Sequence, residues 1–136
     1  MVPIDRQGLV LLMEAGYVYL GLTLFDEARE VFEGITVLAP DNEIPHVAIG
    51  TSFFAQMKYD KAVQSYRKAL KIKQDSAYAR AFLGEALFFL GKREEALSEL
   101  EKALLLDPQG TSGAFAKSLK DAIKNGFVPP PHAGKH

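Results

Sequence analysis

The chain has 136 residues, of which 48% are hydrophobic and 24% are charged, a composition typical of one globular domain with its own hydrophobic core. Its 16 basic and 17 acidic side chains nearly cancel, so the net charge of −1 gives no electrostatic reason to bind nucleic acid or an anionic membrane. The absence of cysteine excludes disulfide bonds, thiolate metal sites and cysteine nucleophiles.

The first element is the most apolar stretch of the chain, residues 9–25. Asp5 lies in its flank, Glu14 interrupts it, and no small-residue cleavage site follows, so we do not expect a signal peptide. These charges also break the stretch below the length of about 20 apolar residues that a membrane span needs. We therefore expect a cytoplasmic protein.

A spacing of 34 residues then recurs along the chain in two series of small residues: the alanines Ala28, Ala62 and Ala96, and the glycines Gly16, Gly50 and Gly84. This period predicts three contiguous units at 9–42, 43–76 and 77–110. Within each unit, apolar residues recur at helical spacing in two runs, so each unit is predicted to be a helical hairpin. Small residues at the repeated positions allow the two helices of a hairpin to approach closely.

The pattern resembles the tetratricopeptide repeat, which has Leu-Gly and then Tyr in its first helix, and Ala, Phe, Ala and Pro later. The third unit fits well, with Leu83, Gly84, Ala96, Ala103 and Pro108. The chain departs from the pattern at the usual tryptophan position, which holds Leu12, His46 and Arg80. The resemblance implies an all-α, right-handed solenoid of three helical hairpins.

A last helix is predicted at about residues 112–125, with Thr111 and Ser112 at its start and an Asn-Gly stop after it. Its apolar stripe predicts a capping helix that covers the exposed end of the stack. We therefore expect a single domain over residues 1–126. The remaining residues, 127–136, contain three consecutive prolines and are predicted to be a disordered tail.

In tetratricopeptide proteins the first helices of the units line a concave face, and the resemblance implies that ligand contacts come from fixed positions on them. Almost all of these positions are apolar or aromatic in this chain, which predicts an apolar peptide, or the apolar face of an amphipathic helix, as the ligand. The predicted peptide-binding residues are Val10, Met13, Tyr17, Leu20, Val47, Thr51, Phe54, Tyr78, Phe82, Glu85, Phe88 and Phe89.

The clamp of Lys, Asn and Arg with which some family members hold an acidic C-terminus is absent from the matching positions. An apolar face of this size is unusual on a monomer, so something should cover it. Three occupants remain open: a separate protein client, a second copy of the chain in a homodimer, or the chain's own tail through Phe127 and Val128.

In its small size, its three repeats and its apolar groove, the chain resembles the export chaperones of bacterial type III secretion systems, both the needle-subunit and the translocator kinds. This resemblance implies a client held as an amphipathic helix, and a small co-chaperone on the first repeat. The alternative is a generic scaffold or adaptor for protein–protein interaction or self-association.

No metal, cofactor or enzymatic activity is expected. The histidines His46, His132 and His136 do not have metal-ligand spacing, and the sequence has no phosphate-binding loop, nucleophile elbow or catalytic triad order. A basic cluster in the second helix of the second unit is interpreted as a solvated convex surface; it consists of Lys58, Lys61, Arg67, Lys68, Lys71 and Lys73.

Overall fold

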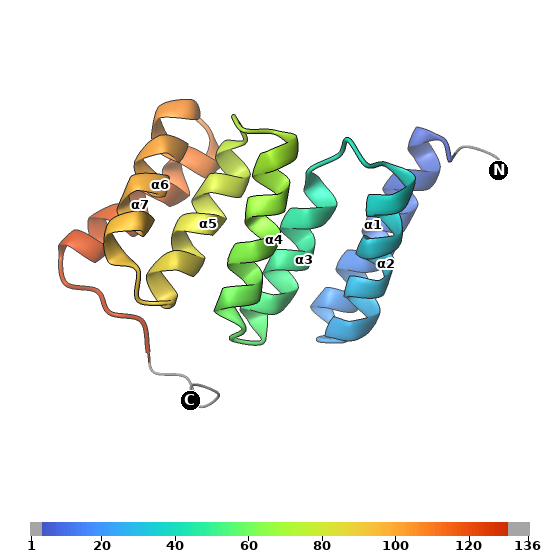
Figure 1. The fold of residues 1–136 in the computed structure, drawn as a ribbon, viewed down its shortest axis with the longest axis horizontal. Helices are drawn as coiled ribbons and strands as arrows, with labels where there is room; N and C mark the ends of the chain where they lie inside the picture. Colours follow the sequence, from blue (N-terminus) through green and yellow to red (C-terminus); the bar gives the residue numbers. More distant parts are fainter. Residues whose placement is uncertain (1–3, 131–136) are drawn as a thin grey trace.

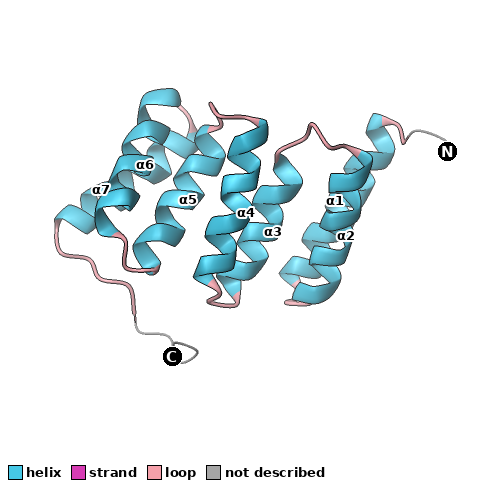
Figure 2. Cartoon of the chain, in the orientation of Figure 1, coloured by secondary structure: helices cyan, strands magenta, loops and turns pink. Residues whose placement is uncertain are grey.

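The computed structural model describes residues 4–130, within which the chain forms seven α-helices and no strand. The helices are α1 (Arg6–Gly21), α2 (Phe25–Leu38), α3 (Ile44–Ala55), α4 (Tyr59–Ile72), α5 (Ala77–Phe89), α6 (Arg93–Leu106) and α7 (Thr111–Lys124). Three hairpins stack along the long axis of the molecule and α7 follows them (Figure 1). Short loops join the helices (Figure 2). The predicted all-α solenoid of three hairpins and a capping helix is confirmed.

The three hairpin turns have the same backbone conformation. Thr23, Met57 and Gly91 lie 34 residues apart, and their φ angles are 59°, 60° and 94°. This left-handed conformation suits glycine, whereas it costs a residue with a Cβ atom about 1 kcal/mol. The repeat therefore imposes the turn even where the sequence does not supply a glycine.

A glycine in each first helix lets the second helix of the hairpin come close. A Cβ atom added at Gly50 would lie 2.5 Å from Tyr66 Cε1, and one added at Gly16 would lie 2.5 Å from Phe32 Cε1. At Gly84 the nearest atom, Leu100 Cδ2, would be 2.7 Å away. Since carbon atoms normally approach to about 3.5–4.0 Å, no larger residue fits without moving the helices apart.

Side chains of the inter-unit loops accept hydrogen bonds at the starts of α5 and α3, where Ser76 is the N-cap of α5 and Asn42 precedes Glu43, the N-cap of α3. The Ala79 amide donates to Ser76 Oγ at 3.0 Å at the start of α5, and the Ile44 amide donates to Asn42 Oδ1 at 3.0 Å at the start of α3. These bonds satisfy amides that have no partner within the helix and fix where each new hairpin begins.

A buried arginine joins the first hairpin to the second. Arg29 Nη1 donates to Ser52 Oγ at 3.1 Å and to Gln56 Oε1 at 2.7 Å, while Nη2 pairs with Asp26 Oδ1 at 2.6 Å. The guanidinium carbon also lies 4.3 Å from the centre of the Phe53 ring. A polar bond network therefore connects α2 to α3.

The buried apolar side chains form two clusters. The smaller one lies among α1, α2 and α3 and contains Ala28, Phe32, Ile35, Ala48 and Ile49. The larger one extends from α3 to α7 and includes Tyr66, Leu83, Leu87, Leu100 and Ile123. Phe53 packs against both clusters, so they meet at α3.

The capping helix covers the last hairpin. Ala116 and Ile123 of α7 are buried in the larger cluster, and α7 contacts both α5 and α6. Its observed bounds, Thr111–Lys124, differ by one residue at each end from the predicted range.

The predicted tail is described only in part. Residues 127–130 have no regular secondary structure, and the ring of Phe127 lies 5.8 Å from that of Phe88 at the end of α5. Residues 131–136, which include His132 and His136, lie outside the described residues.

Candidate peptide-binding groove

The first helices of the hairpins form the inner layer of the solenoid. Contacts join α1 to α3, α3 to α5 and α5 to α7, whereas across residues 4–130 no contacts join α2 to α4 or α4 to α6. Figure 1 shows α2 in front of α1, and α4 in front of α3. Because the layer of first helices is closer together, the stack curves toward it, and α1, α3, α5 and α7 line the concave face.

Ten of the twelve predicted peptide-binding residues present surface on these helices. Tyr17, Tyr78 and Val10 are exposed. The half-buried members are Met13, Leu20, Thr51, Phe54, Phe82, Glu85 and Phe89.

Val47 and Phe88 are buried instead. Phe88 nevertheless helps to line a cavity at the end of α5, and ligand contact by either residue stays a prediction. Val47 has no exposed surface, and Phe88 lies beneath the rings of Phe89 and Phe127, at centroid distances of 6.2 Å and 5.8 Å. Both residues lie in central helices that have neighbours on several sides. Helical position alone does not distinguish a residue at the surface of the groove from one below it.

Phe82 is the centre of one aromatic group on the concave face. Its ring lies 5.0 Å from Tyr78, 6.1 Å from Tyr66 and 5.6 Å from Phe115. The group therefore connects α4, α5 and α7, and it provides a rigid apolar surface near the N-terminal half of α5.

A second aromatic group lies at the C-terminal ends of α3 and α5. The rings of Phe54, Tyr59 and Phe89 are 5.0–5.4 Å apart in every pair. Next to it is a cavity of about 490 Å³, which Phe88, Phe89, Ile123 and Phe127 help to line and at which Arg93 and Lys124 also lie. This end of the groove can hold an apolar side chain.

Polar groups lie between these aromatic surfaces. Tyr17, Thr51 and Glu85 occupy the same position of the three first helices, 34 residues apart. Thr51 Oγ1 lies 3.2 Å from the Tyr66 hydroxyl, and the hydroxyl groups of Tyr17 and Tyr78 interact with each other. The second interaction connects the first repeat to the third across the groove.

Burial changes the ionisation of these groups. It raises the pKa of Tyr17 to about 12 and raises the pKa values of Tyr66 and Tyr78 as well, so all three phenols stay neutral at physiological pH. Burial also raises the pKa of the Glu85 carboxyl from 4.5 to about 7. Glu85 is therefore the one member of this polar group that changes charge near neutral pH.

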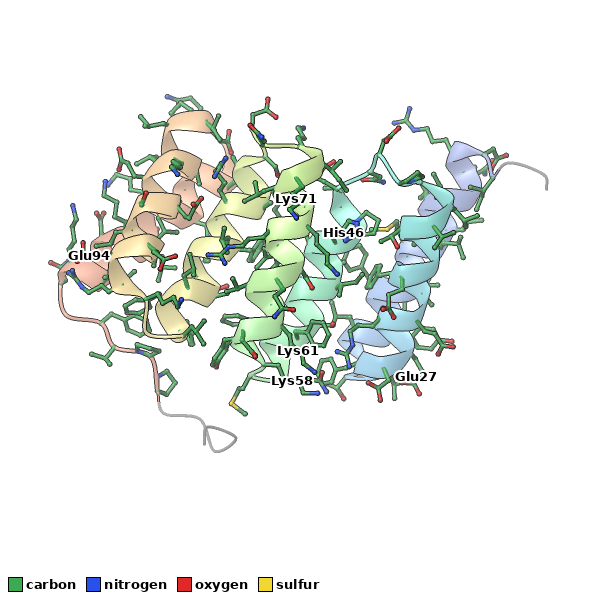
Figure 3. The ribbon with its side chains drawn as sticks, viewed as in Figure 1. Glu27, His46, Lys58, Lys61, Lys71 and Glu94 are labelled. Atoms are coloured by element: carbon green, nitrogen blue, oxygen red, sulfur yellow. The ribbon has the colours of Figure 1, made fainter. Side chains whose placement is uncertain are left out.

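The basic cluster of the second unit lies on another face of the molecule. Figure 3 labels Lys58, Lys61 and Lys71, at the start of α4 and along it. Lys61 Nζ lies 5.7 Å from the centre of the Phe53 ring. The basic cluster therefore belongs to the second helix of its hairpin, as predicted, and does not contribute to the concave face.

The described part of the chain provides no metal site: among residues 4–130, no three His, Asp or Glu side chains are grouped so as to hold an ion. None of its helices combines the length and the apolar character needed to cross a bilayer. The chemistry that the groove offers is the burial of apolar surface with a few hydrogen bonds.

Sequence reasoning missed two contributors to the groove. Tyr66 is itself buried, but its hydroxyl lies 3.2 Å from Thr51 Oγ1 and so supports the concave side from below. Phe115 lies on the predicted capping helix, and its ring extends the Phe82 group. A phenol at a position that elsewhere needs only an apolar side chain was the available signal for Tyr66.

Comparison with known families and proteins agrees with this geometry. The model of the tetratricopeptide repeat family matches residues 53–120, half of the chain. Anaphase-promoting complex subunit 3 of Schizosaccharomyces pombe is 30% identical over 115 residues, which cover 83% of this chain but only 17% of that protein. The chain thus spans less than a fifth of this relative.

Solved structures share the fold at lower identity. The type III secretion chaperone SycD of Yersinia enterocolitica, in complex with a peptide of the translocator YopD, has a TM-score of 0.78 at 22% identity, covering 91% of this chain and 98% of that one. The first repeat domain of Spaghetti (RPAP3), bound to the HSP90 peptide SRMEEVD, has a TM-score of 0.77 at 24% identity, covering 92% and 97%.

Proposed function

Since the chain belongs to the tetratricopeptide repeat family, we propose that it is a protein-binding module that acts as a chaperone, holding an apolar or amphipathic helical segment of a client in its concave groove. The observation that carries this proposal is apolar surface on the concave face. Val10, Tyr17 and Tyr78 are 49%, 41% and 36% exposed, and half-buried phenylalanines lie beside them. Such a surface gains free energy when a client covers it.

The character of the groove favours a type III secretion chaperone over a domain that captures an acidic peptide. The HSP90 peptide bound to the RPAP3 domain contains Glu and Asp side chains, and carboxylates need cationic or amide donors. The concave positions of this chain contain no Lys or Arg. Apolar clients, such as a segment of an exported subunit that would otherwise self-associate, suit it better.

The alternative is a scaffold or adaptor that self-associates, and the outer face of α1 favours it. Leu11, Val18 and Leu22 are 62%, 60% and 61% exposed, and they lie on one side of the helix together with Ala15. Within the described residues no helix covers this side, whereas α7 covers the other end of the stack. A second copy or a small co-chaperone would bury this stripe.

The test removes exposed aromatic surface from the groove. A Tyr17→Ala/Tyr78→Ala variant and the wild-type chain are immobilised, proteins captured from the source organism's lysate are identified, and the client is purified for direct measurement of affinity. We expect the double variant to bind the client at least about tenfold more weakly. Circular dichroism shows whether it remains folded.

Leu105→Ala is the matched control, because Leu105 lies on α6, outside the concave face, and is 71% exposed. Equal client affinity in the double variant and in this control would contradict a groove function. Val18→Glu distinguishes the alternative: it disrupts assembly through α1 and leaves capture in the groove unchanged.

A further inference from the structure

The ligand-facing positions on the first helices of the three units carry charge of only one sign. These positions are residues 10, 13, 14, 17, 20 and 21 of the first unit and the residues 34 and 68 places later in the second and third units. The charged residues among them are Glu14 and Glu85, and none is Lys or Arg. Glu14 is exposed at the side of the first repeat, whereas Glu85 is half-buried in the third. Arg93 and Lys124 line the cavity at the far end of the groove. Between the two aromatic groups, however, these positions offer a carboxylate and no cation, which is complementary to a basic group on the ligand.

The Glu85 carboxyl has no ion-pair or hydrogen-bond partner among residues 4–130. The ion pairs found among residues 4–130 are all made by carboxylates other than Glu85, and Glu85 makes none of the side-chain hydrogen bonds found there. Its titratable neighbours are Tyr59 and Tyr66 of α4, whose pKa values are raised, so they stay neutral. No charged group on α3, α6 or α7 contributes to the shift of its pKa, which burial causes.

A client that covers the groove must remove the remaining water from this carboxyl group. If the client is purely apolar there, Glu85 must become the protonated acid and remains without a hydrogen-bond partner, because an unpaired carboxylate is not buried. A Lys or Arg side chain restores the lost interaction with a charge-assisted hydrogen bond. An apolar side chain of the client cannot do so.

We propose that Glu85 is a specificity-determining residue that selects client segments in which one Lys or Arg interrupts the apolar face. The ligand class is a basic amphipathic helix: apolar side chains contact the two aromatic groups, and the cation lies against Glu85 between them. This inference rests on the proposed function of the groove, and it names the chemistry of the partner.

The experiment screens a displayed library of amphipathic helical peptides, about 15 residues long, against the full chain. Three forms are compared: wild type, Glu85→Gln and Glu94→Gln. Glu94 is a matched control, because it lies on α6 (Figure 3) with a side chain that is 86% exposed, and its ion pair within residues 4–130 is with the neighbouring Arg93. Peptides selected by the wild type are also tested on Tyr17→Ala/Tyr78→Ala.

We expect wild type and Glu94→Gln to select Lys or Arg at one position, and Glu85→Gln to lose that selection. For a selected peptide, replacing its Lys by norleucine should reduce affinity for the wild type about tenfold and leave affinity for Glu85→Gln unchanged. The preference for Lys should also decrease as the pH falls below 7, because a protonated carboxyl cannot pair with a cation.

Other outcomes separate the two proposals. Peptides that need Tyr17 and Tyr78 but show no preference for a basic residue would overturn the role of Glu85 and leave the groove function intact. Peptides that bind Tyr17→Ala/Tyr78→Ala as well as wild type, or a library without any binder, would overturn the groove function and with it the role of Glu85.

Discussion

Gly50→Ala tests whether the close approach of helices within a hairpin is set by the glycine. The added Cβ atom would lie 2.5, 2.7 and 2.9 Å from three atoms of the Tyr66 ring, about 1 Å inside normal contact. Tyr66 is 1% exposed, and its hydroxyl is held at 3.2 Å from Thr51, so the ring has no free space to move into.

Overpacking of this kind costs about 3 kcal/mol, and the better helix propensity of alanine offsets about 1 kcal/mol. We therefore expect the free energy of unfolding to fall by about 2 kcal/mol. Gly34→Ala is the control, because Gly34 lies within α2 and a Cβ atom there meets nothing within 4 Å. That variant should gain about 1 kcal/mol.

The assay is urea-induced unfolding followed by far-UV circular dichroism, with slopes compared among the three proteins so that midpoints report stability. The two variants should lie on opposite sides of wild type, and their free energies of unfolding should differ from each other by about 3 kcal/mol. A Gly50→Ala protein as stable as Gly34→Ala would refute the reasoning, because it would mean that Tyr66 yields at no cost.

Three further predictions concern the turns, the first interface and Glu85. Met57→Gly should stabilise the chain by about 1 kcal/mol in the same urea assay, because φ at this position is 60°; no gain would mean that the turn is not strained. Arg29→Met should lower the free energy of unfolding by about 2 kcal/mol and speed hydrogen exchange in α1 and α2, because it removes the bonds to Ser52 and Gln56; unchanged exchange would count against the network. The free energy of unfolding should fall by about 2 kcal/mol as the pH rises from about 4.5 to about 7, because the folded state binds the Glu85 proton more tightly than the unfolded state does, with a pKa of about 7 against 4.5; Glu85→Gln should abolish this fall, and an identical pH profile in both proteins would contradict it.

The fold could be predicted because its information is periodic. Gly50 and Tyr66 recur in equivalent form in each unit, and a fixed period without gaps permits only a stack of like hairpins. The side of a helix that faces the groove could be predicted for the same reason, as Tyr17 and Tyr78 illustrate. Depth could not be predicted, since Val47 occupies a groove position and yet has no exposed surface.

Interactions between repeats were also beyond the sequence pattern. The interaction of Tyr17 with Tyr78 joins residues 61 positions apart, and it depends on how strongly the stack curves. The half-burial of Glu85 depends on aromatic rings from neighbouring helices. Neither the curvature nor the resulting loss of hydration is visible in the local pattern of apolar and polar residues.

The division of the core at α3 has a consequence for the order in which the molecule opens. The cluster among α1, α2 and α3 is small and relies on Arg29, whereas the cluster from α3 to α7 is larger and continuous. In a linear array, each unit is stabilised only by its neighbours, so the terminal unit with the smaller interface opens first. We therefore expect the first hairpin to open at a lower free energy than α5 and α7, so that one wall of the groove can move while the other stays in place.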